Sequence, residues 1–184
     1  MPLPRLVQPL DAEVSETPAP GGFMMLYGLA GEAHASSAQF GRALQLVGEG
    51  AELPPAYVLL LRAGSAHALS EHRVTVMEAC SAAELAAGSA INRVLTTSGC
   101  PVAFAEGVVR RARGIRSAHG VLLELNIPCG VEMGDITNLA QLRNKAAHGA
   151  SRVDWAAAHV AVTVARTLVS TLLGPATPIG QKQG

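Results

Sequence analysis

The stretch MEACSAAELAAGSAI, residues 77–91, is the most informative about how this 184-residue chain folds. Six of its fifteen residues are alanine, which has the highest intrinsic helix propensity and whose small side chain lets helices pack closely. The same helical repeat of apolar residues extends in both directions, from about Glu71 to Leu95. We therefore expect one long helix here, packed tightly against other helices.

Helical periodicity recurs on both sides of this stretch. Upstream, Pro54 and Pro55 precede the apolar run YVLLL (57–61), and proline is tolerated in the first turn of a helix. Downstream, apolar repeats of helical period continue through three more segments. The five expected helices span about residues 55–69, 71–95, 102–119, 135–148 and 152–173. The sequence thus predicts a mainly α protein, with a bundle of about five helices over residues 54–173.

The two ends of the chain differ from this helical region. Residues 1–20 hold five of the eleven prolines, and two short candidate strands follow, Gly22–Leu29 and Ala43–Val47. For residues 1–53, an N-terminal appendage, three interpretations stay open: a small α/β unit, a β unit, or the remnant of a longer upstream domain. Residues 174–184, which contain two prolines, are expected to be a flexible tail.

Composition narrows the class of protein. With 49 % apolar residues the chain can build a core, so disorder of the whole chain is excluded. Three cysteines without a CxxC pair favour neither a disulfide framework nor a zinc site, and they indicate a reducing, cytoplasmic setting. No secretory signal is recognisable, and the longest apolar stretch, Trp155–Leu173, contains His159 and Arg166, so we expect no membrane span. The histidines lack metal-ligand spacing, and we expect neither a metal site nor a cofactor.

The charges are balanced in number but not in position. There are 14 basic and 14 acidic residues, yet 5 basic and 10 acidic ones fall before residue 107, which leaves 9 basic and 4 acidic ones after it. Much of the basic excess comes from Arg110, Arg111, Arg113 and Arg116, with Lys145 among the basic residues further on. Such local asymmetry can bind an anion, and Arg110, Arg111, Arg113 and Lys145 are candidates for contacts with phosphate groups. The alternative is an ordinary solvated helix face.

Two of the expected helices carry a charge on their apolar side. A helical wheel from Met77 places Glu84 near the middle of the apolar stripe, and a wheel from Ile136 does the same for Arg143. An unpaired buried charge is costly and usually finds a partner. We therefore expect the two helices to pack together and Glu84 to pair with Arg143, within the reach of about 6 Å that direct pairing allows.

The helix that carries Arg143 ends in the sequence LRNKAAHG, residues 142–149. Asn144 and His148 are four residues apart and share one edge of the helix, so the amide can orient the imidazole. With Arg143, the cluster combines a fixed cation, a hydrogen-bonding amide and a group that titrates near neutrality. The alternative is structural, because a basic last turn followed by Gly149 is also what an ordinary helix C-terminus favours.

Arg143, Asn144 and His148 resemble the signature of the HEPN superfamily, the higher-eukaryote and prokaryote nucleotide-binding helical domains. Its motif is Arg, a polar residue, three variable residues and His. The surroundings are similar as well: an alanine-rich helix with an acidic residue, a variable helix, the motif near a helix end, and a long closing helix. The resemblance covers roughly residues 54–173, leaves residues 1–53 unexplained, and implies a HEPN-like helical bundle.

The resemblance also implies an activity. Many HEPN proteins are metal-independent endoribonucleases of toxin–antitoxin pairs, phage defence or RNA processing. His148 would move a proton at the ribose 2′-OH or at the leaving oxygen, while Arg143 and Asn144 hold the phosphate, and a 2′,3′-cyclic phosphate would result. RNA is the implied substrate, and an antitoxin or regulatory protein is a further implied partner. Some toxins carry a Tyr two residues after the motif His, where this chain has Ala150.

Association with a second copy is expected on two grounds. HEPN proteins usually bring the motifs of two protomers together, and the segment 152–173 carries a second apolar face with Trp155, Val162 and Val169. That face could meet another helix, the N-terminal appendage or another chain, and we expect a homodimer. The alternative to a nuclease is a non-catalytic HEPN-like module that dimerises or binds a nucleotide or a partner protein.

Overall fold

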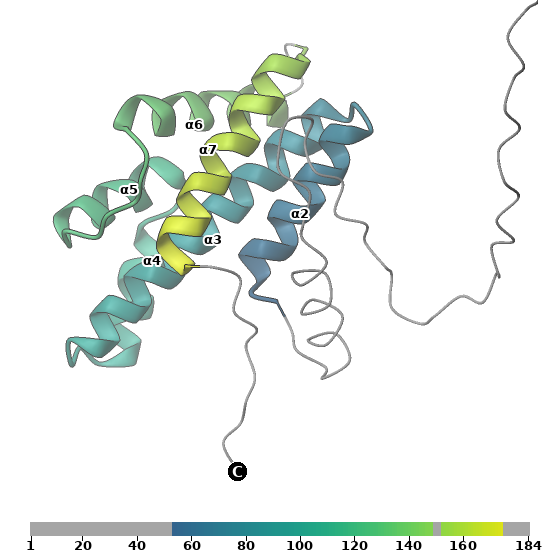
Figure 1. The fold of residues 1–184 in the computed structure, drawn as a ribbon. Helices are drawn as coiled ribbons and strands as arrows, with labels where there is room; N and C mark the ends of the chain where they lie inside the picture. Colours follow the sequence, from purple (N-terminus) through teal and green to yellow (C-terminus); the bar gives the residue numbers. More distant parts are fainter. Residues whose placement is uncertain (1–52, 149–151, 175–184) are drawn as a thin grey trace, which may run out of the picture.

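The computed structural model describes residues 53–148 and 152–174, which form six helices and no strand within those two ranges (Figure 1). The mainly helical bundle expected from the sequence is therefore confirmed. The candidate strands Gly22–Leu29 and Ala43–Val47 lie outside the described residues. The helices are α2 (Pro55–Ala68), α3 (His72–Thr97), α4 (Val102–Arg111), α5 (Ile115–Glu124), α6 (Met133–His148) and α7 (Trp155–Leu173).

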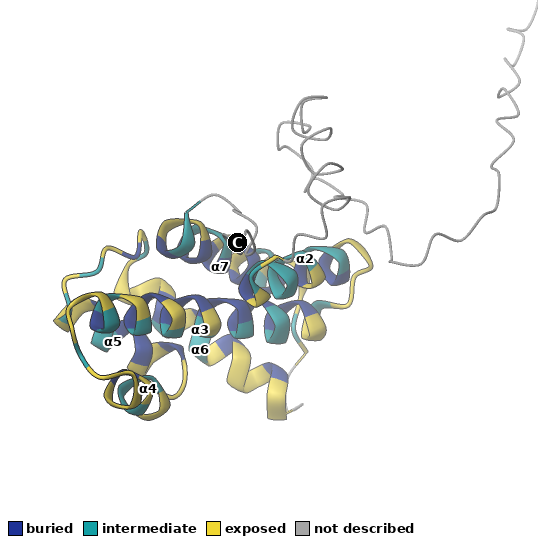
Figure 2. Ribbon diagram, turned by 90° about the horizontal axis from the view of Figure 1, so that it is seen from below, coloured by how far each residue is buried: buried dark blue, intermediate teal, exposed yellow. Residues whose placement is uncertain are grey.

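Helix α3 lies at the centre of the bundle. It makes its most extensive contacts with α2 and α7, and it also packs against α4, α5 and α6. The alanines of the stretch 77–91 are all fully buried, and the buried colour follows α3 along its length in Figure 2. Because an alanine side chain ends at Cβ, neighbouring helices approach this side of α3 closely, and the interior is filled with little side-chain volume.

The helix expected over residues 102–119 is two helices in the structure. Helix α4 ends at Arg111, and α5 begins at Ile115 after a short turn. The break falls at Gly114, whose φ of 81° lies in the left-handed region that glycine adopts without steric cost. The prediction of one helix over residues 102–119 was wrong, because the apolar repeat on both sides of Gly114 does not reveal the turn between them. The turn gives Arg116, which follows it on α5, a new direction.

Helix α7 begins with a side-chain cap. Asp154 precedes the helix in an extended conformation, and its Oδ1 accepts a hydrogen bond of 2.8 Å from the backbone N–H of Ala157. Two of the residues assigned to the second apolar face, Val162 and Val169, are buried inside the bundle. Trp155, the third, is 57 % exposed. Most of that face is therefore covered within one protomer.

The start of α2 and the ends of α3 and α7 meet at one end of the bundle. The Tyr57 hydroxyl donates a hydrogen bond to the carbonyl oxygen of Gly174, which directly follows α7. The guanidinium of Arg93, near the end of α3, donates to the carbonyl oxygen of Leu172 at 2.8 Å. These contacts satisfy two carbonyl groups at the C-terminus of α7 that have no partner within the helix.

Candidate functional site

The motif residues lie on α6, whose buried side determines where they point. Ile136, Leu139, Leu142 and Ala146 are the buried residues of α6, and they follow the three- and four-residue spacing of one helix face. Leu142 and Ala146 each precede a residue that the wheel from Ile136 had placed on the apolar side. The expected buried stripe was therefore rotated by about one residue, because alanines are apolar but carry little burial signal.

Arg143 consequently lies at the edge of the core. Its side chain is 44 % exposed and that of Glu84 is 29 % exposed, so the expectation of two inward-facing, buried charges was wrong. The two side chains do meet, with 4.0 Å between Arg143 Nε and Glu84 Oε1. The contact joins α6 to α3, the helix pair on which the sequence argument placed it. At this exposure the pair remains accessible to water and to an ion in solution.

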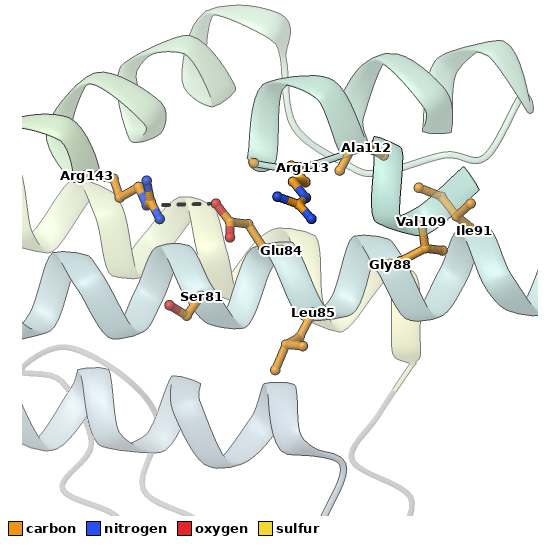
Figure 3. A pocket seen from close by; sticks show the side chains of 11 residues that line it. Ser81, Glu84, Leu85, Gly88, Ile91, Val109, Ala112, Arg113 and Arg143 are labelled. Carbon is orange, nitrogen blue, oxygen red and sulfur yellow. Dashed lines mark ion pairs between the residues drawn. The ribbon is translucent and has the colours of Figure 1, made fainter. Parts of the chain in front are cut away.

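Glu84 and Arg143 open onto a hollow between α3, the α4–α5 turn and α6. The hollow has a volume of about 670 Å³, and Arg113 contributes to its wall from the α4–α5 turn. Figure 3 shows Glu84 between the guanidinium groups of Arg143 and Arg113. The floor consists of small or apolar groups of α3, among them Gly88 and Ile91. One carboxylate thus faces two guanidinium groups.

A second, smaller hollow of about 200 Å³ adjoins the first and shares Glu84, Arg113 and Arg143 with it. It is also lined by Arg116 of α5 and by Asn144 of the motif. Three arginines and one carboxylate leave a formal excess of positive charge around the joined hollows, which we call the arginine pocket. Such a surface favours a phosphate group, because guanidinium nitrogens present several donors in a fixed plane.

Of the four residues predicted to contact phosphate groups, the structure brings one to this pocket. Arg113 lines it, and its Nε donates a hydrogen bond of 3.3 Å to the carbonyl oxygen of Arg110. Arg110 itself lines a separate hollow on α4, and Arg111 is exposed at the end of that helix. Lys145 is exposed in the last turn of α6 and lines neither part of the pocket.

Arg116 belongs to the basic excess of the sequence, but it is not among the four residues predicted to contact phosphates. It reaches the pocket because the chain turns at Gly114 and α5 runs in a new direction. On an unbroken helix over residues 102–119, Arg113 and Arg116 would have followed Arg110 along one face. The signal that could have revealed the turn is the glycine itself, which is followed by a renewed apolar repeat from Ile115.

His148 is the last residue of α6 and is exposed. Its side chain makes no hydrogen bond to Asn144 or to any other residue within the described ranges. Five positions along an α-helix correspond to about 7.5 Å of rise and about 140° of rotation, so Arg143 and His148 of one chain point in different directions. The carbonyl oxygen of the preceding residue, Ala147, accepts a hydrogen bond of 3.1 Å from Arg73, which joins this end of α6 to the start of α3.

A buried thiol lies next to the carboxylate of the arginine pocket. Cys80 is fully buried one helical turn before Glu84, and its Sγ donates to Glu84 Oε1 at 3.6 Å. Burial, and then the negative charge of Glu84, raise the pKa of the Cys80 thiol to about 12, although the positive charge of Arg143 acts in the opposite direction. The thiol therefore stays protonated near neutral pH and orients the carboxylate rather than acting as a nucleophile.

The structure also assembles a group of four rings that the sequence did not indicate. The ring centroid of His67 on α2 lies 6.1 Å from that of His72 on α3. It lies 5.4 Å from the ring centroid of Trp155 and 5.7 Å from that of His159, both on α7. Burial and then the charges of His159 and His72 lower the pKa of His67, which favours the neutral form of this imidazole. Among the described residues, no group of three or more His, Cys, Asp or Glu is arranged to hold a metal ion.

Comparisons with known proteins return no relative: no family profile, no curated protein and no solved structure matches this chain. Helices α3 and α7 are each long and apolar enough to cross a bilayer by length and composition alone. However, 56 % and 44 % of their apolar windows are buried inside the bundle, and core helices of soluble proteins pass the same test. The two helices are therefore weak support for a membrane, and the cytoplasmic setting stays a prediction.

Proposed function

We propose that this protein is a HEPN-type, metal-independent endoribonuclease that cleaves RNA by attack of the ribose 2′-OH on the adjacent phosphate. The observation that carries the proposal is that Arg143 and Asn144 of the motif line the same accessible pocket as Arg113 and Arg116. A phosphodiester held there would meet several N–H donors, which stabilise the charge that develops on its oxygens as the 2′-oxygen attacks.

His148 is the proton-transfer group in this proposal. An imidazole with a pKa near neutrality can take the proton of the 2′-OH or give one to the departing 5′-oxygen. The bond from the 2′-oxygen to phosphorus forms, the bond to the 5′-oxygen breaks, and a 2′,3′-cyclic phosphate is left. No redox partner or metal enters this balance.

The proposal includes a homodimer whose site combines two chains. Within one chain, His148 and Arg143 project in directions about 140° apart on α6, so they do not converge on one phosphate. A second copy can supply His148 to a phosphate held by Arg143 of the first copy, as in a symmetric interface in which each patch meets its own equivalent. Toxin–antitoxin function or phage defence, with a neutralising or regulatory protein, is the biological setting that this activity fits.

Cleavage of RNA by purified protein in excess chelator tests the activity. We expect wild type to leave 2′,3′-cyclic phosphate ends, detectable by mass spectrometry, and His148→Ala and Arg143→Ala each to lower the rate by roughly 10²- to 10⁴-fold. Gln141→Ala is the matched control, because this residue is exposed on the same helix and lies outside the pocket and the motif. The proposal would be rejected if wild type left the RNA intact, or if the two motif variants cut RNA at the wild-type rate.

Mixing the two inactive variants tests the composite site. If Arg143 of one chain works with His148 of the other, a mixed dimer of the variants contains one complete pair out of two. Random exchange of subunits then restores roughly a quarter of wild-type activity. Failure of the mixture to recover any activity, in a sample shown to exchange subunits, argues for a site within one chain.

A non-catalytic HEPN-like module is the second candidate, and one contact favours it. Glu84 forms an ion pair with Arg143 and places a negative charge where a phosphate would bind. A protein that only binds a nucleotide or a partner tolerates such a competitor. In the chelator assay this candidate predicts binding of RNA or nucleotide without cleavage, and no effect of His148→Ala on that binding.

A further inference from the structure

The four-ring group ends at the surface in an exposed tryptophan. Trp155 is 57 % exposed, and His159 lies against it in a stacked arrangement, with 4.9 Å between the ring centroids and 8° between the ring planes. His67, which is buried, contacts the same tryptophan at 5.4 Å from a second helix. The indole is therefore supported from below by packed rings while more than half of its surface faces solvent.

The four-ring group, which we call the ring platform, consists of His67, His72, Trp155 and His159. It lies at the same end of the bundle as the last turn of α6. His72, at the first position of α3, packs against His67, and the adjacent Arg73 donates its hydrogen bond to Ala147, the residue before His148. The start of α3 thus links the rings to the end of the motif helix. Figure 1 shows the C-terminal end of α6 and the N-terminal end of α7 close to the start of α3.

The charges around the platform suit a polyanion. Arg73, Lys145 and Arg152 are exposed at this end of the bundle. Two acids lie near them: Glu71, which is exposed directly before α3, and Asp154, which already accepts a hydrogen bond from the backbone at the start of α7. The net charge of the surroundings is positive, whereas a surface evolved for a protein partner is usually depleted of lysine and is apolar at its centre.

We propose that Trp155 stacks a nucleobase of the RNA on which the motif acts, so that the nucleotide next to the cleaved bond is held by its base as well as by its phosphate. The identity of the ligand as RNA rests on the proposed function. Stacking on an aromatic ring accepts any base, because each base has a π-face, and it requires an unpaired nucleotide. The expected substrate is therefore single-stranded or looped RNA with little base preference at this position.

Because Trp155 is the single tryptophan of the chain, its fluorescence reports this contact directly. The probe is a short single-stranded oligonucleotide with 2′-O-methyl groups throughout, which cannot supply the attacking hydroxyl and so stays intact. We expect saturable quenching of the tryptophan by this probe. An abasic oligonucleotide with the same number of phosphates is expected to leave the fluorescence unchanged.

Variants measure the contribution to affinity with a labelled probe of the same chemistry. Trp155→Ala is expected to weaken binding roughly tenfold, and Trp155→Phe, which keeps a ring, to weaken it much less. Phe104→Ala is the matched control, because Phe104 on α4 is also 57 % exposed and should not affect binding. A thermal unfolding curve for each variant separates loss of the contact from loss of the fold.

The outcomes separate this inference from the proposed function. Cleavage that depends on His148, combined with unchanged fluorescence and with normal binding by Trp155→Ala, overturns the stacking site and leaves the nuclease in place. Quenching by the 2′-O-methyl probe without cleavage of ordinary RNA supports the stacking site and rejects the nuclease. An emission spectrum that shifts with protein concentration in the absence of RNA would place Trp155 in a contact between copies or with another protein, and would also overturn the inference.

Discussion

The two sides of α3 differ in burial: one is packed inside the bundle, and the other borders the arginine pocket. On one side its alanines are fully buried and bring the neighbouring helices close, and on the other Glu84 is partly exposed in a hollow bordered by arginines. The first side stabilises the bundle because its apolar groups are removed from water. On the second side water still enters, so the charged groups there remain accessible to an ion in solution. The comparison teaches that the helix that holds the fold together also forms the floor of the candidate site.

The largest effect should come from adding volume on the alanine side. Ala83→Leu forces three more carbon atoms into a closely packed interior and is expected to lower the free energy of unfolding by about 1–3 kcal/mol. Ser89→Leu is the control, because Ser89 is exposed on the same helix and should change stability by less than about 0.5 kcal/mol. Urea unfolding followed by circular dichroism measures both, and equal effects would show that the alanine side is not closely packed.

Acid should have the next largest effect, because α2, which packs against α3, carries a buried histidine, His67. The pKa of His67 is lowered in the folded protein, so below the unfolded value of about 6.5 the unfolded chain binds more protons than the folded one. Stability is then complete above that pH and falls as the pH decreases, with a slope of up to about 1.4 kcal/mol per pH unit for one proton.

Urea unfolding at pH 7.5 and at pH 5.5 checks this dependence. His67→Leu is expected to reduce the difference between the two conditions, because the group that must stay neutral is gone. The arginines of the pocket remain charged throughout this range and contribute no such slope. A wild-type stability that does not change between the two pH values would contradict the assignment of a neutral, buried His67.

A smaller effect should follow from neutralising the carboxylate on the open side. Glu84→Gln removes the negative charge next to Arg143 and is expected to cost at most about 1 kcal/mol of stability, as for other exposed ion pairs. It should also tighten RNA or phosphate binding by roughly fivefold, because the repulsion between Glu84 and a bound phosphate, which the variant removes, is about 1 kcal/mol as well.

Glu78→Gln provides the comparison for that measurement, since Glu78 is on α3 but does not line the arginine pocket. Titration of labelled RNA by fluorescence anisotropy at two salt concentrations gives the affinity and its electrostatic part. If both variants bind alike, Glu84 does not compete with phosphate, and the pocket is not the place where phosphate binds.

The smallest effect tests how closely α4 approaches the floor of the pocket. A Cβ at Gly88 would lie 3.2 Å from Val109 Cγ1, whereas a Cβ at Gly64 in the middle of α2 meets nothing within 4 Å. Alanine is favoured over glycine in a helix interior by about 1 kcal/mol, so Gly64→Ala should gain most of that amount. Gly88→Ala should gain roughly 0.5 kcal/mol less, and thermal unfolding of the two variants measures the difference.

Local repeats were sufficient to predict the main helices and the meeting of Glu84 with Arg143. The central helix follows from its alanines, which few other structures accommodate in such density. The burial of the ion pair could not be predicted, because a wheel treats Ala140 and Ala147 as strongly apolar, whereas Leu142 and the packing geometry decide which side faces inward. Which residues of α6 form the buried stripe can be decided to within one position only when the packing of the neighbouring helices is known.

The remaining features depend on contacts between distant parts of the chain. Arg116 reaches the pocket through the backbone conformation of Gly114, which the helical repeat on either side obscured. His67 and Trp155 are 88 positions apart, and neither has a neighbour in sequence that signals a shared aromatic group. Packing of α2 and α7 around the start of α3 is what brings the rings together.

The hydrogen bond from Tyr57 to Gly174 allows the order of the helices along the chain to be changed. It holds the beginning and the end of the described helical unit side by side, at the end of the bundle away from the C-terminal end of α6. A short glycine–serine linker could therefore join the two, and new termini could be opened in the exposed turn around Arg113 and Gly114. Such a circular permutant should keep its core, and it would show whether the arginine pocket needs a continuous α4–α5 connection.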